Sequence, residues 1–211
     1  MASYIATRTR AIRNRLAGVT TVAAILLAAV FVPDVLAGAQ VNKDADVTRG
    51  TSDLAIEVQK ILSEHSRWVD SNGATGSRAE LREEDLSRLD LSGIYLNGAD
   101  LRGCNLAFSN VSNGVFLLTD LSGANLEQVN ARRADFTGAN LSEACLRGAR
   151  MNYAKFEAMD LKGPDGKPLG RRASSNLSRA DLRDADFTGA LLQDAVLTDA
   201  NVEGAKIKLP D

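Results

Sequence analysis

Apolar residues recur at every fifth position over most of the chain. The series runs without a gap from Leu81 to Leu161, and it resumes from Leu177 to Ile207. The position two residues before each member is mostly small, as at Ala99, and the position just before it is often Asn or Asp, as at Asn125. Neither a helix nor a flat strand returns to the same face at an interval of five residues. The pattern therefore predicts a chain that bends after every five residues and buries one large and one small side chain in each block.

The blocks GADLR, GANLS, RADFT and RADLR resemble the A-(D/N)-L-x-x unit of the pentapeptide-repeat proteins, and the resemblance covers residues 79 to 208. It implies an all-β solenoid, a right-handed quadrilateral β-helix with four blocks per coil. The large centre residue and the small residue of each block then point inward, and the other three point outward. Residues 79–211 would form this β-helix, with about six coils stacked on one another.

Four blocks per coil mean that residues twenty apart should stack. We expect one such column, the core ladder, to consist of Leu96, Phe116, Phe136, Phe156 and Phe187. The last member depends on the interruption after Leu161, because removing eleven residues there brings Phe187 into the column. The Pro, Gly and charge content of this segment predicts a surface loop inserted at about residues 163–174.

The first 39 residues differ from the repeats. Four arginines precede an uncharged run from Leu16 to Val32, and small residues that include Ala37 and Ala39 follow it. This order is typical of an export signal with an A-x-A cleavage site. The alternative is a retained membrane anchor, a hydrophobic helix of roughly 26 Å. In both cases the arginines would stay in the cytoplasm and the rest of the chain would lie outside it, in the periplasm or its equivalent.

Two further segments connect this leader to the repeats. Residues 40–50 are polar and predict a linker. Apolar positions from Leu54 to Val69 follow the spacing of one helical face, so residues 51–78 are expected to form a short amphipathic helix and its lead-in. Such a helix must cover something apolar, and the N-terminal end of the solenoid is available. His65 is the only histidine, and we interpret it as a packed helix residue because no catalytic partner accompanies it.

Composition excludes several function classes. The chain has 25 Lys and Arg against 27 Asp and Glu, so its charge does not indicate a nucleic-acid partner. Cys104 and Cys145 have neither the number nor the spacing of a disulfide framework or a zinc site. No nucleophile with a base and no phosphate-binding loop accompanies them. We therefore expect no enzyme activity, no cofactor, no metal and no small-molecule substrate.

Two surfaces are candidates for binding an unknown protein partner. The candidate partner surface is apolar and consists of Tyr95, Val115, Leu117 and Leu118. It is predicted to face outward where the family usually has polar residues, although a locally imperfect repeat would give the same pattern. The candidate basic loop consists of Lys167, Arg171 and Arg172. It could meet an acidic partner or anionic head groups, or be a solvated loop only.

Three functions agree with these observations. The first is an exported or membrane-tethered scaffold that binds a protein partner outside the cytoplasm. The second follows from the resemblance, because some members of that family imitate duplex DNA and bind type II topoisomerases. Those members are strongly acidic and cytoplasmic, whereas the segment from Ala79 onward has 20 Asp and Glu against 16 Lys and Arg, a net charge of −4. The third is a structural spacer in an envelope assembly.

Overall fold

The computed structural model describes residues 46–163 and 166–208, with side chains described from Val58 onward. The chain divides into two compact units, Met1–Ile61 and Leu62–Asp211, and the second holds all of the repeats. The predicted signal or anchor at residues 1–39 lies outside the described residues, as does the first part of the predicted linker. Within the described residues, no helix combines the length and the apolar character needed to cross a membrane.

Helix α2 spans Asp46–Asp70 and is longer than predicted. Residues 46–50, which were expected to be linker, are its first residues, so that prediction was wrong at this boundary. In the second unit the end of α2 contacts the start of the first coil. The backbone N–H of Ala79 donates to His65 Nδ1 at 3.0 Å, and the N–H of Ser77 donates to the carbonyl oxygen of Glu64 at 3.2 Å. His65 is fully buried there and acts as a backbone acceptor.

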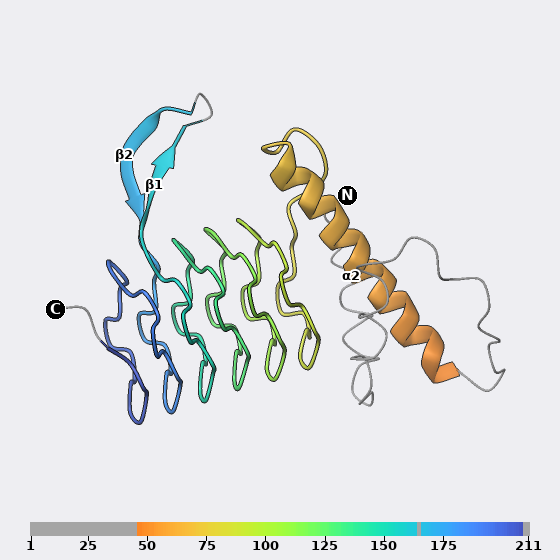
Figure 1. The fold of residues 1–211 in the computed structure, drawn as a ribbon. Coiled ribbons are helices and arrows are strands. Elements are labelled where there is room, and N and C mark those ends of the chain that lie inside the picture. Colours follow the sequence, from red (N-terminus) through yellow and green to blue (C-terminus); the bar gives the residue numbers. More distant parts are fainter. Residues whose placement is uncertain (1–45, 164–165, 209–211) are drawn as a thin grey trace. The chain divides into compact units, whose positions relative to one another are not determined.

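The repeats form a row of stacked coils in the second unit (Figure 1). Residues twenty apart pair as parallel bridges between neighbouring coils. The pairs run from Glu80 with Asp100 to Asp135 with Lys155, and they resume from Asn176 with Val196 to Asp186 with Lys206. Beside each pair, the N–H of an apolar centre donates to the neighbouring coil, as Leu81 does to the carbonyl oxygen of Asp100 at 2.8 Å. Four blocks of five separate paired residues, so each coil has four sides. Each side contributes one short bridge in place of a long strand.

A left-handed residue in each block explains the period of five. The turn after Leu96 is closed by the N–H of Ala99, which donates to the carbonyl oxygen of Leu96 at 3.0 Å. The second residue after the centre has positive φ, with +67° at Gly98 and +57° at Asn113. A turn of this kind requires φ above zero at that position, which Gly and Asn adopt at little cost. The repeated turn bends the chain at every fifth residue.

The core ladder fills one column of the interior. Phe116, Phe136 and Phe156 are at most 1% exposed. The rings of Phe116 and Phe136 are stacked with centroids 4.9 Å apart, and those of Phe136 and Phe156 with centroids 5.1 Å apart. Offset stacking at these distances adds to the stabilisation that burial provides.

Phe187 does not belong to this column, and the predicted register was wrong here. Arg150 pairs with Asp186, which places Phe187 after Met151 on the neighbouring side. Lys155 pairs with Leu191, so Leu192 is the residue that follows Phe156. Phe187 still contacts Phe156 from that side, with ring centroids 5.6 Å apart at 49°.

The cause is the length of the insertion. Asn140 pairs with Asn176, a separation of 36 residues in place of 20, so the insertion adds sixteen residues and not eleven. It forms an antiparallel hairpin of β1 (Met159–Lys162) and β2 (Pro168–Ala173), which projects from the coils (Figure 1). Leu161 therefore lies in β1 and is not a centre of the repeat. The loop predicted at about 163–174 begins earlier than expected, and the count of about six coils included one block too many.

Candidate functional site

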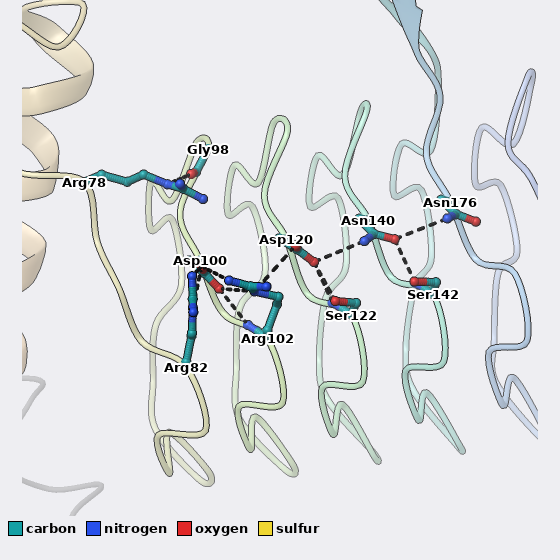
Figure 2. A network of polar contacts seen from close by, with 10 residues as sticks. All are labelled: Arg78, Arg82, Gly98, Asp100, Arg102, Asp120, Ser122, Asn140, Ser142 and Asn176. Carbon is teal, nitrogen blue, oxygen red and sulfur yellow. Dashed lines mark hydrogen bonds and ion pairs between the residues drawn. The ribbon is translucent and has the colours of Figure 1, made fainter. Parts of the chain in front are cut away.

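Ladders of Asp and Asn side chains run along three of the four sides. We name the sides after the first apolar centre on each: Leu81, Leu86, Leu91 and Leu96. On the Leu81 side, Asn140 Nδ2 donates to Asp120 Oδ1 at 3.1 Å, and Asn176 Nδ2 donates to Asn140 Oδ1 at 3.3 Å (Figure 2). The matching ladders on the next two sides are Asp85, Asn105, Asn125 and Asp90, Asn110, Asn130.

The chemistry of the two side chains explains their order. A carboxylate only accepts hydrogen bonds, so Asp can begin a ladder, whereas each Asn both donates and accepts. The same oxygens also accept backbone N–H groups two residues later, as Asn140 Oδ1 does from Ser142 at 3.2 Å. Stacking the coils therefore already uses these polar groups, which explains the many Asp and Asn residues without catalysis.

Asp100 forms the most elaborate polar contact on the Leu81 side. Its side chain is 3% exposed and receives Arg82 Nε at 2.6 Å and Arg102 Nε at 2.9 Å (Figure 2). Hydrogen bonds from Arg102 are the main reason that the pKa of Asp100 lies well below its usual range, although burial acts in the opposite direction. A carboxylate held ionised by two guanidinium groups is a poor general base, so we assign this network to stability.

The fourth side, which begins at Leu96, lacks a ladder. Its outward column contains Tyr95, Val115, Asp135, Lys155 and Leu191. Tyr95 is 62% exposed and pairs directly with Val115 on the next coil. Tyr95 and Val115 therefore make this side apolar over the first two coils.

The structure brings the candidate partner surface together. Leu117 and Leu118 follow Phe116 on the same side, and Leu118 is 41% exposed. Leu118 also has φ of +55°, in the region that a large side chain rarely adopts. Its side chain leans over Gly138, where an added Cβ would lie 2.9 Å from Leu118 Cδ2. A bulky apolar residue at a position suited to Gly or Asn costs stability and remains exposed.

The basic loop residues lie on the hairpin. Arg172 contacts Asp160 at 3.4 Å and Asp194 at 3.1 Å, so carboxylates already compensate its charge. Arg171 is exposed, and it lies on the opposite face of β2 from Arg172 because successive strand residues alternate. Lys167 lies at the turn, where its carbonyl oxygen accepts the N–H of Gly163 at 2.8 Å. The three cations therefore do not form one patch.

Both cysteines are free thiols in the described part of the chain. Cys104 is buried in a small inward position, and this burial raises the pKa of its thiol to about 12. Cys145 is half-buried next to a centre. Among residues 46–163 and 166–208, no group of three His, Cys, Asp or Glu side chains is arranged to hold a metal ion.

A polar groove, which was not predicted from the sequence, lies on the Leu91 side. It has a volume of about 490 Å³. Its lining consists of Ser112, Asn113, Asn130, Arg132, Arg133, Asn152 and Tyr153. Residues 112, 132 and 152 are twenty apart, as are 113, 133 and 153, so the stacking rule could have found the groove from the sequence. We call it the arginine groove.

Comparison with known proteins agrees with this geometry. The family described as Pentapeptide repeats matches in eight copies, over residues 79–116, 118–163 and 175–208, which is more than half of the chain. No curated protein matches significantly.

Similar solved structures include Rfr23, a pentapeptide repeat protein from the cyanobacterium Cyanothece 51142, at 22% identity and a TM-score of 0.43, covering 60% of this chain and 86% of that chain. A pentapeptide repeat protein from the Arabidopsis thaliana thylakoid lumen is 21% identical, with a TM-score of 0.40 and coverage of 64% and 71%. QnrB1, a plasmid-mediated fluoroquinolone resistance protein, is 16% identical, with a TM-score of 0.29 and coverage of 62% and 92%. Because all three TM-scores lie below 0.5, the family assignment rests on the repeat match.

Proposed function

Because the chain belongs to the pentapeptide-repeat family, whose members fold as right-handed quadrilateral β-helices, we propose that it is a non-enzymatic scaffold that binds a protein partner. In this proposal the protein is exported, or tethered by an N-terminal helix, and works outside the cytoplasm. The arginines before Leu16 and the small residues at Ala37 and Ala39 support that location.

The observation that carries the proposal is the candidate partner surface. Tyr95 and Leu118 are exposed on a side without an Asp or Asn ladder, and Val115 and Leu117 adjoin them. Aromatic residues with an apolar body and a polar tip are enriched at protein interfaces. Most of the Tyr95 side chain and much of the Leu118 side chain remain exposed beyond their contacts with the next coil, so a partner accounts for them better than stability does.

The first alternative is a DNA-mimicking binder of a type II topoisomerase. Imitation of duplex DNA requires a continuous acidic surface. The acidic residues here are interspersed with cations, and several are neutralised, as Asp100 is by Arg82 and Arg102. The second alternative, a spacer in an envelope assembly, differs from the main proposal in having no discrete partner surface.

Site-specific crosslinking tests the proposal. A photoreactive amino acid is placed at Tyr95, and a matched one at Gln128, which is exposed on the Leu86 side. We expect position 95 to capture a defined protein that position 128 does not. Equal capture at both positions, or capture at neither, would leave the spacer alternative. Inhibition of topoisomerase supercoiling by the purified chain would favour the DNA mimic.

Cell fractionation with N-terminal sequencing tests the location separately. A mature start near Gln40 in the soluble envelope fraction corresponds to signal cleavage, and an intact N-terminus in the membrane fraction corresponds to an anchor. An uncleaved protein in the cytoplasm would contradict the proposed location.

A further inference from the structure

We propose that the arginine groove binds a sugar unit that carries a carboxylate, as in an acidic polysaccharide. This inference concerns a different side from the candidate partner surface, and it does not depend on a protein partner. It is carried by three features of the groove: unpaired guanidinium groups, an interrupted amide ladder and a supported aromatic ring.

The guanidinium groups of the groove lack carboxylate partners. Arg132 and Arg133 line the groove and are exposed on adjacent outward positions. Arg150 is not part of the lining, but it is exposed on the following coil next to Asn130, which is. Within residues 58–163 and 166–208, none of the three lies within 4.0 Å of an Asp or Glu oxygen. On the Leu81 and Leu86 sides several arginines pair with carboxylates, as Arg102 does with Asp100 and Arg183 with Asp181. The positive charge of this groove is therefore available to an anion.

One guanidinium is held in place. Arg132 Nε donates to Asn152 Oδ1 at 3.1 Å, across two stacked coils. This contact uses one of the five donors of the guanidinium group and leaves the others free to bind a carboxylate. A fixed, planar donor fork suits bidentate recognition of a carboxylate.

The amide ladder stops at the groove. Asn110 and Asn130 continue the ladder from Asp90, but Arg150 occupies the position where the next Asn would donate. Asn130 Oδ1 is consequently buried without a hydrogen-bond partner. A buried unsatisfied acceptor destabilises the fold, and Asn at position 150 would satisfy it. Arg150 stands here in place of a ladder Asn, and its exposed guanidinium adds positive charge next to a residue that lines the groove.

Tyr153 provides an aromatic surface beside the arginines. It is 61% exposed and has φ of +60°, a conformation that is unfavourable for a large residue. Gly189 on the next coil supports its ring, because an added Cβ there would lie 2.7 Å from two ring atoms. The ring is therefore packed along one part and free along the rest. Such a ring can stack on the C–H face of a pyranose.

The remaining lining identifies the ligand class. Asn113 and Ser112 each provide both a donor and an acceptor, which match the hydroxyl groups of a sugar. The Asn152 side chain is already bonded to Arg132 and to Asp186. A phosphate ion accepts hydrogen bonds but offers few donors to the amide oxygens, and an acidic peptide has no ring of hydroxyl groups. The volume of about 490 Å³ lies within the range of small-molecule pockets.

Calorimetric titration of the full chain with a short oligogalacturonate tests the proposal. We expect binding that a neutral galactan oligosaccharide, inorganic phosphate and an oligoglutamate of equal charge do not reproduce. Arg133→Gln should weaken the affinity at least about tenfold, since it removes charged hydrogen bonds. Arg147→Gln is the matched control, because Arg147 lies on the Leu86 side near Asp181, and it should leave the affinity unchanged. Equal binding of oligoglutamate, or an equal loss in both variants, would overturn the proposal.

Two further variants separate recognition from folding. Arg150→Asn should raise the unfolding midpoint by completing the ladder, and it should also weaken oligogalacturonate binding. Gly189→Ala should weaken binding because the added Cβ would displace the Tyr153 ring. Gly123→Ala is the matched control and should leave binding unchanged, because Gly123 has a similar φ of +65° and open space around it. Unchanged affinity in Arg150→Asn and Gly189→Ala would show that neither the interrupted ladder nor the tyrosine serves a ligand.

Discussion

Replacing Phe136 by Ala tests the core ladder at its centre. The ring is completely buried and stacks on Phe116 and Phe156 at 4.9 and 5.1 Å. Removing the ring from the core costs about 2–3 kcal/mol in transfer free energy. Each of the two lost stacking contacts costs about 0.5–1.5 kcal/mol more. These terms sum to about 3–6 kcal/mol. Buried Phe to Ala changes typically cost about 3–5 kcal/mol, so we expect Phe136→Ala to lower the free energy of unfolding by that amount.

Urea denaturation followed by far-UV circular dichroism measures this loss. Trp68 fluorescence provides a second probe at the first coil, because the indole lies close to Gly98. If the coils unfold cooperatively, circular dichroism and Trp68 fluorescence should give the same transition. A separate, earlier transition by circular dichroism would mean that the variant unfolds the middle coils and leaves the first coil folded.

Two variants serve as controls. Phe136→Leu should cost only about 1–2 kcal/mol, because Leu96 and Leu192 occupy the same column and show that Leu fits it. Phe108→Ala removes an exposed ring whose contact is the Arg88 guanidinium at 4.8 Å, and it should cost less than about 1 kcal/mol. If Phe136→Ala cost no more than Phe108→Ala, the ladder would not be a source of stability.

Three further predictions follow from individual contacts. In thermal melts, Gly76→Ala should lower stability far more than Gly93→Ala. A Cβ added at Gly76 would lie 2.2 Å from a carbonyl oxygen of α2. A Cβ added at Gly93 would meet open space, so that variant should show only the cost of the left-handed backbone, about 1–2 kcal/mol. The pKa of Asp100 is lowered in the fold, so its carboxylate stabilises the protein above the unfolded pKa of about 3.9, and this contribution is lost as the pH falls below that value. Asp100→Asn should therefore have a lower urea midpoint at neutral pH and a flatter acid dependence, and an unchanged acid dependence would contradict this assignment. Leu161→Ala should lower the free energy of unfolding by less than about 1 kcal/mol in chemical denaturation, because Leu161 lies half-exposed in β1. A larger loss would mean that the Leu161 side chain is buried in the core.

The inward half of this fold could be predicted from the sequence. A period of five with a large and a small apolar residue allows little other than a chain with regular corners. Every uninterrupted block from Leu81 to Phe156 places its centre in the interior. The same local rule could be applied at each block without knowledge of the others, because each turn depends only on its own residues.

The register across the insertion could not be predicted in this way. Leu161 has the correct residue type and spacing for a centre, and nothing in its own block shows that it pairs in a hairpin. Its assignment is decided by the antiparallel pairing of Met159 with Ala173, a contact between residues fourteen positions apart. One wrongly counted block then moved Phe187 from its own side to the next. A non-local pairing thus overrode a local pattern.

The outward surfaces were only partly predictable, and the left-handed position explains why. The turn requires φ above zero at the second residue after each centre, where Gly, Asn and Asp are favourable. Phe108, Leu118 and Tyr153 occupy this position with φ of +61°, +55° and +60°, and all three are exposed. Leu118 could be singled out from the sequence because Leu117 precedes it, whereas Phe108 and Tyr153 have no large apolar residue next to them in the chain. In a fold where the corner residue is set by backbone geometry, a large side chain at a corner opposes that geometry. Such corners are therefore the positions at which to look first for function.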